Sequence, residues 1–130
     1  EMKIHHVGYY VQDIKKARNI FSMMGFDEES EEIYDEERGI NVLFLTNGEN
    51  RIELIEKCTE ESDVDFIAKG KRSMPYHICY EVNNMEESVD FLKQNRFIVI
   101  KKPSNAIAIQ NRKVAFLYCK ECGLIELVEK

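Results

Sequence analysis

The sequence predicts an α+β fold in which one βαβββ module occurs twice. Two observations indicate the duplication: His6-Val7-Gly8-Tyr9 is matched by His77-Ile78-Cys79-Tyr80, and Ile52-Glu53-Leu54 is matched by Ile125-Glu126-Leu127. A third observation is that each copy opens with an alternating run of β-branched and aromatic residues and continues with apolar residues at helical spacing. Self-similarity at a fixed spacing is typical of a repeated structural unit.

The spacing of the repeat is nearly constant along the chain. Residues 5–26 align with residues 76–97 at an offset of 71, without a gap. The offset is 72 where Phe44 aligns with Phe116, and 73 where Glu53 aligns with Glu126, so the second copy contains two single-residue insertions. Because an extra residue within a strand would exchange its two faces, both insertions are expected in turns.

The first module is predicted to span residues 2–56. It begins with a strand at 4–11, after which Gln12-Asp13 precede a helix that ends at Gly25. The helix is predicted from apolar residues spaced three and four apart, namely Ile14, Ala17, Ile20, Phe21 and Met24. Three shorter strands are predicted to follow, at 29–34, 40–46 and 51–56.

The second module is predicted to span residues 76–130 and to repeat this order. A strand at 76–82 leads into a helix, where the side chain of Asn84 can cap the first turn and Glu87 can complete a capping box. The apolar stripe of this helix consists of Met85, Val89 and either Phe91 or Leu92. The three predicted strands that follow lie at 97–101, 113–119 and 124–129.

Residues 57–75 form the predicted linker between the modules. This segment is rich in Glu, Ser and Lys, and a short helix is expected at about 64–69, before Pro75, which prevents a helix from continuing. A chain of 130 residues with 44% hydrophobic residues suits one compact core. Residues 1–130 are therefore expected to form a single domain.

Charge and hydropathy exclude several classes of partner. The formal net charge is −6, and acidic residues crowd residues 28–37, so a polyanion such as nucleic acid would be repelled. We expect no membrane span and a cytoplasmic protein, since the sequence contains neither an apolar run of about 20 residues nor a secretory signal. Under those conditions the four cysteines are expected as thiols rather than as a disulfide framework.

The repeated histidines and glutamates form a candidate metal site. Strand alternation directs His6 and His77 to an open face, because their apolar neighbours should lie beneath the helices. Glu53 and Glu126 are expected on the same face of the last strands among apolar neighbours, where a carboxylate is costly unless it is paired or bound to a cation. Two imidazoles and two carboxylates are a complete ligand set for a divalent metal.

These and other residues also have simpler interpretations. A single buried histidine is more often a hydrogen-bonded core residue than a ligand, but four such residues at matching positions favour the metal. His5 has no counterpart, since Tyr76 occupies that position, and is expected to donate a hydrogen bond near the site. Cys119 and Cys122 have CxxC spacing in a predicted hairpin, but no second pair completes a tetrahedral zinc site, so the spacing is interpreted as incidental.

Together, the doubled module and the motifs around His6, Glu53, Tyr76-His77-Ile78 and Glu126 resemble the vicinal oxygen chelate superfamily of glyoxalases, bleomycin resistance proteins and dioxygenases. The resemblance covers nearly the whole chain. It implies two modules that share a cupped mixed β-sheet, and it implies His6, Glu53, His77 and Glu126 as the metal ligands.

Within this superfamily the chain is similar to compact bacterial glyoxalase I (lactoylglutathione lyase) and to methylmalonyl-CoA epimerase. Residues 61–69 and 112–117 resemble the epimerases. However, residues 106–111 replace the glycine-rich segment usual in epimerases, and Glu53 stands where epimerases may carry Gln. These departures favour a glyoxalase I that isomerises a thiol hemithioacetal of methylglyoxal through a metal-bound enediolate, with methylmalonyl-CoA epimerase as the alternative.

Two other members of the superfamily are less compatible with the residues present. An antibiotic-binding protein of the bleomycin-sequestering type would not be expected to retain all four ligands. A ring-cleaving dioxygenase uses two histidines and one carboxylate on iron and is usually longer, so both Glu53 and the chain length speak against it.

The resemblance also implies roles for individual residues. Glu126 is expected to be the principal base and Glu53 the other candidate, while Glu36 or Glu37 would be the second acid of an epimerase. One divalent ion per site is implied, with Ni or Co favoured and Zn or Mn possible. A homodimer is expected, and the metal site is either contained in one chain or shared between subunits.

The substrate implied is a small thiol-derived molecule or a coenzyme A thioester, and its tail is anionic in either case. Basic groups are needed to bind such a tail. The candidates are Arg112 and Lys113, with Lys71-Arg72 and Lys101-Lys102 as further clusters, although solvated loop charges are the simpler interpretation of any one of them.

Overall fold

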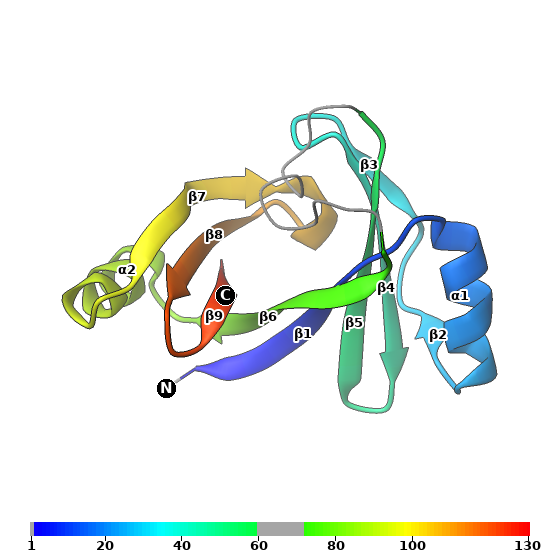
Figure 1. Cartoon of the computed structure of the whole chain (residues 1–130), viewed down its shortest axis with the longest axis horizontal. Coiled ribbons are helices and arrows are strands. Elements are labelled where there is room, and N and C mark those ends of the chain that lie inside the picture. The colour runs from blue at the N-terminus through cyan, green and yellow to red at the C-terminus, as the bar shows by residue number, and fades with distance from the viewer. Residues whose placement is uncertain (1, 60–71) are drawn as a thin grey trace. The chain divides into compact units, whose positions relative to one another are not determined.

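The computed structural model describes residues 2–59 and 72–130, and its helices and strands confirm the α+β class (Figure 1). The elements in chain order are β1 (Lys3–Tyr10), α1 (Ile14–Met23), β2 (Asp27–Glu28), β3 (Ile33–Asp35), β4 (Ile40–Asn47), β5 (Asn50–Lys57), β6 (Met74–Val82), α2 (Met85–Gln94), β7 (Ile98–Ala106), the 3-10 helix η1 (Ile107–Ile109), β8 (Arg112–Cys119) and β9 (Gly123–Glu129). None of the helices in these described ranges is long and apolar enough to span a membrane.

The chain divides into two compact units, whereas the predicted single domain with modules 2–56 and 76–130 stays a prediction. One unit is His6–Tyr76, and the other joins the first residues of the chain, up to His5, to His77–Lys130. In the first unit the strand order is β2-β4-β5-β1, with β3 also paired to β4. Strand β1 is parallel to β5, whereas β4 is antiparallel to β2, β3 and β5. This half of the sheet is therefore mixed.

The second unit repeats the same pairing pattern. Its strand order is β6-β9-β8-β7, in which β6 is parallel to β9 and the other neighbours are antiparallel. In both units the opening strand thus pairs in parallel with the closing strand, and a hairpin joins the last two strands. The predicted βαβββ order is confirmed in the second unit, while the first contains one additional short strand.

The core of the first unit lies between α1 and the strands β4 and β5. It consists of Val11, Ile14, Leu43, Leu45, Ile52 and Leu54. Phe21 of the helix extends this core, because its ring meets Tyr9 at a centroid distance of 5.2 Å and Phe26 at 5.7 Å. The burial of Ile52 and Leu54 confirms that the intervening Glu53 lies on the other face of β5.

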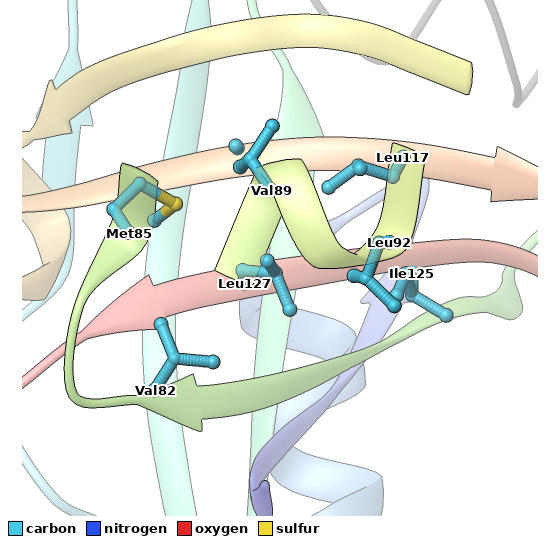
Figure 2. Close-up of a cluster of buried hydrophobic side chains, with 8 residues drawn as sticks. Val82, Met85, Val89, Leu92, Leu117, Ile125 and Leu127 are labelled. Atoms are coloured by element: carbon cyan, nitrogen blue, oxygen red, sulfur yellow. The ribbon is translucent and has the colours of Figure 1, made fainter. Parts of the chain in front are cut away.

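The core of the second unit lies between α2 and the strands β6, β8 and β9, and Figure 2 shows the helix side chains directed toward these strands. Its buried members are Val82, Met85, Val89, Leu92, Ala115, Leu117, Ile125 and Leu127. Each fully buried aliphatic side chain contributes about 1.5–3 kcal/mol relative to exposure. Because Phe91 is 59% exposed, Leu92 is the member of the predicted helical stripe that enters the core.

A duplicated contact attaches the start of each helix to the closing strand of its own unit. The backbone N–H of Ile14, at the start of α1, donates to Glu56 Oε2 at 3.1 Å. The N–H of Met85, at the start of α2, donates to Glu129 Oε2 at 2.8 Å. Asn84 accepts from the N–H of Glu87 at 2.9 Å, which confirms the predicted cap. A carboxylate at these positions satisfies a free helical N–H and interacts favourably with the helix dipole.

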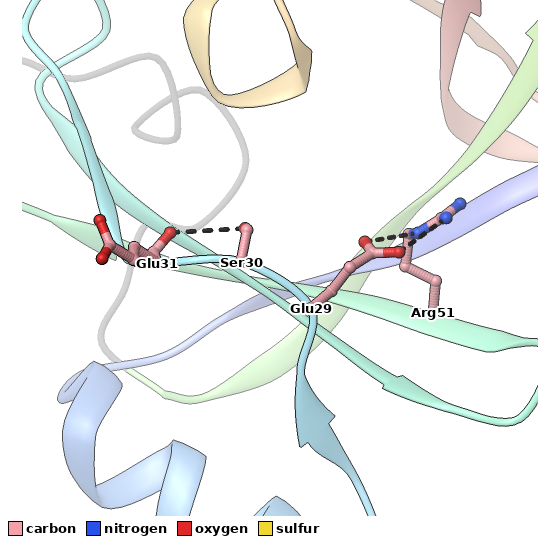
Figure 3. Close-up of polar contacts among 4 residues, drawn as sticks. All are labelled: Glu29, Ser30, Glu31 and Arg51. Atoms are coloured by element: carbon pink, nitrogen blue, oxygen red, sulfur yellow. Dashed lines mark hydrogen bonds and ion pairs between the residues drawn. The ribbon is translucent and has the colours of Figure 1, made fainter.

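The segment predicted as one strand at 29–34 differs in the structure, where β2 ends at Glu28 and β3 begins at Ile33. Figure 3 shows the contacts at this break: the carboxylate of Glu29 accepts two hydrogen bonds from Arg51, from Nε and Nη2, each at 2.9 Å. Ser30 Oγ also donates to the carbonyl of Glu31 at 3.4 Å. The backbone N–H of Glu29 still donates to the carbonyl of Phe44 at 2.9 Å, but the strand is interrupted after it, so the strand prediction was wrong for 29–32.

One of the two insertions lies in the turn between the last two strands of the second unit. In the first unit Asn47 pairs with Asn50 across a turn of residues 48–49, whereas in the second Cys119 pairs with Gly123 across residues 120–122. The prediction that this insertion lies in a turn is confirmed. The other insertion falls in a region where β7 extends beyond the predicted 97–101 and has irregular register between Val99 and Ser104. The predicted linker helix at 64–69 lies outside the described residues.

Candidate active site

In the first unit, His6 and Glu53 form a buried pair. His6 Nε2 lies 3.2 Å from Glu53 Oε1. The parallel pairing of β1 with β5 sets this geometry, because Gly8 is the register partner of Glu53 and His6 lies on the same face of β1 as Gly8. His6 is 0% exposed and Glu53 is 5% exposed. A carboxylate buried to this degree requires a partner, and the imidazole supplies one.

The second unit builds the same pair from the repeated residues. His77 Nε2 lies 3.0 Å from Glu126 Oε1, and both residues are buried. Here Cys79 is the register partner of Glu126 in the parallel pairing of β6 with β9. Each unit therefore offers one imidazole nitrogen and one carboxylate oxygen at hydrogen-bonding distance from each other.

An aromatic ring supports each histidine, and these two residues were not identified from the sequence as part of the site. Phe44 lies opposite Glu53 in the β4–β5 ladder, and Phe116 lies opposite Glu126 in the β8–β9 ladder. The His6 and Phe44 rings meet edge to face at 5.3 Å, and the His77 and Phe116 rings at 5.2 Å. Edge-to-face packing restricts the orientation of the imidazole. The matching of Phe44 with Phe116 in the repeat was the available signal.

The expectation that these side chains point to an open face was wrong. His6, His77, Glu53 and Glu126 are all buried. Alternation along a strand predicts which residues share a face, and that part is correct for each pair, but alternation carries no information on what covers the face. A buried histidine–glutamate pair needs either a proton on Nε2, which the carboxylate accepts, or a cation in place of that proton.

Arg112, predicted as a substrate-binding residue, makes two contacts within the second unit. Its Nη2 donates to Glu81 Oε2 at 2.6 Å, and its Nε donates to the carbonyl of Glu129 at 2.7 Å. The hydrogen bond from Arg112 and the positive charge of its guanidinium hold the pKa of Glu81 below its usual value. Arg112 therefore joins β8 to β6 and β9.

The other residues predicted to contact substrate are exposed in the structure. Lys113 lies in β8, Arg72 precedes β6, and Glu36 lies in the turn between β3 and β4. Asp35, the last residue of β3, is 3% exposed and pairs with Arg38 of this turn at 2.9 Å. Substrate contact by Lys113, Arg72 and Glu36 stays a prediction, as does the role given to His5 near the site.

Residues 5–116 match the family model of the Glyoxalase/Bleomycin resistance protein/Dioxygenase superfamily. The chain therefore belongs to this superfamily, as its repeated motifs predicted. A hypothetical protein from Bacillus halodurans has a solved structure with a TM-score of 0.88 to this chain, at 26% sequence identity, and the match covers 100% of this chain and 95% of that protein. This likeness supports the fold class inferred from the repeat.

Two relatives of the chain within the superfamily are epimerases. The mitochondrial methylmalonyl-CoA epimerase of Homo sapiens is 30% identical over 96% of this chain and 72% of its own length. The ethylmalonyl-CoA/methylmalonyl-CoA epimerase of Cereibacter sphaeroides is 27% identical over 96% of both chains. These relatives favour the epimerase alternative over the expected lactoylglutathione lyase. Residues 106–111 and Glu53 were therefore weak grounds for preferring a glyoxalase I.

Proposed function

We propose that this protein is a metal-dependent epimerase that acts on a coenzyme A thioester of the methylmalonyl-CoA type. The observation that carries the proposal is its similarity to the human and Cereibacter sphaeroides epimerases over 96% of the chain. The buried pairs His6–Glu53 and His77–Glu126 agree with it, because superfamily enzymes of this type use such residues as ligands.

We propose further that the two pairs together hold one divalent cation, either within one chain or with one pair from each of two subunits of a homodimer. The donor set fits: two imidazole nitrogens and two carboxylate oxygens suit Ni or Co best, with Zn or Mn possible, and leave room for two further oxygen ligands. When bound, such a cation supplies Lewis acidity that makes a carbon next to a carbonyl easier to deprotonate. It would also offset the cost of burying Glu53 and Glu126.

Epimerisation at a carbon between a carboxylate and a thioester requires removal of one proton and its return from the opposite face. Two acid–base groups are therefore needed. Glu126 is the principal base in this proposal and Glu53 the other candidate within the buried pairs. The exposed Glu36, in the turn before β4, is the candidate for the opposite face. Lys113 and Arg72, with Arg112, are the candidates for binding the phosphates of coenzyme A.

The direct test is proton exchange at the reacting carbon. Protein loaded with Co, Ni, Mn or Zn is incubated in D₂O with one epimer of methylmalonyl-CoA, and NMR follows deuterium at that carbon together with formation of the other epimer. We expect both, dependent on the metal. Turnover of the hemithioacetal of methylglyoxal and glutathione in a parallel assay, with no exchange on methylmalonyl-CoA, would instead establish glyoxalase I. Inactivity on both substrates with metal bound would contradict the enzymatic proposal.

A further inference from the structure

The turn between β8 and β9 brings two thiols together. Cys119 is the last residue of β8, and Cys122 precedes the first residue of β9. Their sulfur atoms lie 3.1 Å apart. A disulfide bond is about 2.05 Å long, so the two sulfurs need to approach by only about 1 Å to become bonded.

The backbone holds both cysteines in this arrangement. Cys119 is the register partner of Gly123, which closes the hairpin. Gly123 has a φ of +79°, in the left-handed region that favours glycine, and this conformation turns the chain within three residues. The corresponding turn of the first unit, at 48–49, is one residue shorter, so the thiol pair occupies the turn that carries the insertion.

The two thiols are chemically unequal. Cys119 is 8% exposed, and its hydrogen-bond contact with Cys122, together with the backbone N–H groups of the turn, lowers the pKa of Cys119. Cys122 is exposed, and partial desolvation together with its bond to Cys119 raises its pKa. The thiolate therefore forms more readily on Cys119 than on Cys122. A thiolate beside a second thiol is the arrangement of a reactive cysteine with its resolving partner.

We propose that Cys119 and Cys122 form a reversible dithiol–disulfide couple that hydrogen peroxide oxidises. The Cys119 thiolate attacks one peroxide oxygen, the O–O bond breaks, and the departing hydroxide takes up a proton to give water, leaving a sulfenic acid on Cys119. The sulfur of Cys122 then attacks that of Cys119. The S–S bond forms, the S–O bond breaks, and the second hydroxide leaves as water with the thiol proton. The two thiols lose two electrons, which peroxide accepts.

The couple lies at the end of a hairpin that also contributes to the candidate active site. Phe116 and Glu126 face each other in the same ladder, three pairs from Cys119 and Gly123, or about 10 Å along the strands. A disulfide would fix the turn of this hairpin in one conformation. The proposal nevertheless does not depend on the epimerase activity, and its test needs no substrate.

The test determines the covalent state of each cysteine in the 130-residue chain. The protein is treated with hydrogen peroxide, its remaining thiols are blocked with N-ethylmaleimide, and it is digested with trypsin without reduction. Cleavage after Lys113 and Lys120 separates Cys119 and Cys122 into peptides 114–120 and 121–130. We expect these two peptides to remain linked, and the thiol titre to fall from the four cysteines of the chain by half. Dithiothreitol should restore the full titre.

Two variants separate the couple from general oxidation. Cys58→Ser is the matched control, because Cys58 is exposed but lies outside the turn, and it should leave the linked peptides unchanged. Cys122→Ser should stop the reaction at a Cys119 sulfenic acid that dimedone traps. The proposal is overturned if the wild-type protein gives no linkage of 114–120 to 121–130, or if the linkage occurs only in a dimer on non-reducing electrophoresis. Oxidation of Cys119 to sulfinic acid without linkage would overturn it equally.

Discussion

The two histidines have nearly the same surroundings. His6 Nε2 lies 3.2 Å from a buried glutamate oxygen, and the His6 ring packs edge to face on a phenylalanine at 5.3 Å. For His77 the corresponding distances are 3.0 Å and 5.2 Å. This agreement arises because the repeat preserves the strand register and not only the residue types. A buried pair of this kind requires either a shared proton or a bound cation. Substitution of these histidines and glutamates therefore tests the metal proposal most directly.

Glu126→Gln and Glu53→Gln are matched variants that separate the roles of the two carboxylates. An amide oxygen can still coordinate a metal but cannot accept the substrate proton. If Glu126 is the principal base, Glu126→Gln should lower kcat by about 10²–10⁴-fold while metal content is retained. Glu53→Gln should lower kcat much less, because its amide oxygen can still coordinate the metal and Glu126 still accepts the proton. Metal content by mass spectrometry and deuterium exchange by NMR measure the two effects. Equal losses in both variants would contradict the assignment of the base.

The pairs themselves were predictable from the sequence, because a repeat fixes which residues correspond and strand alternation fixes which face they share. His6, Glu53, His77 and Glu126 were all identified in this way. Their burial was not predictable, since it depends on what covers the face. The contacts of Arg112 were also not predictable. The sequence shows only that Arg112 is a cation that could bind an anionic substrate tail. Its contacts with Glu81 and the Glu129 carbonyl arise from the tertiary arrangement of the strands.

At the scale of elements, the helices and closing strands were predictable and the edges of the sheet were not. Apolar spacing located α1 and α2, and alternation located the buried faces of β5 and β9. The strand predicted at 29–34 is interrupted between Glu28 and Ile33, and no local sequence pattern indicates this break. The extension of β7 through Pro103 was not predicted. Proline is excluded from central strands but tolerated at a sheet edge, and β7 is the end strand of its unit.

Arg112 links three strands of the second unit, and its contact with Glu81 should make stability depend on pH. The pKa of Glu81 is lowered in the folded state, so the ionised carboxylate stabilises the fold above its ordinary pKa of about 4.5. This stabilisation is lost as the pH falls through the lower folded pKa. Arg112→Gln should therefore reduce the free energy of unfolding near neutral pH by on the order of 1 kcal/mol. The difference from wild type should shrink at acidic pH.

Urea unfolding followed from neutral pH to about pH 3 measures this dependence. Because the bond from Arg112 to the Glu129 carbonyl does not titrate, part of the difference should remain at low pH. Glu81→Gln is the matched control: it removes the titrating group alone and should approach the wild-type stability as the acid limit is reached. An Arg112→Gln effect that is constant across the pH range would show that Glu81 contributes nothing measurable.

The two histidine–glutamate pairs, one in each unit, bind either one shared cation or two separate cations. Each unit folds around its own core and contains its own histidine–glutamate pair, so the geometry of one pair does not depend on that of the other. One cation per two pairs predicts a stoichiometry of one metal ion per chain, whether the pairs come from one chain or from two subunits. Two independent sites would predict two ions per chain.

Thermal unfolding with and without metal distinguishes these cases. A ligand that binds only the folded state stabilises it by about 2.7 kcal/mol at a free concentration of 100 times Kd. We expect Co or Ni to raise the Tm of the metal-free wild-type protein, and we expect His6→Ala and His77→Ala each to abolish most of that rise, because each removes one of four ligands from the same ion. Cys58→Ser is a control that should keep the full rise. If each histidine variant instead retained half of the bound metal and its own shift in Tm, the two pairs would be separate sites and the shared-cation proposal would be wrong.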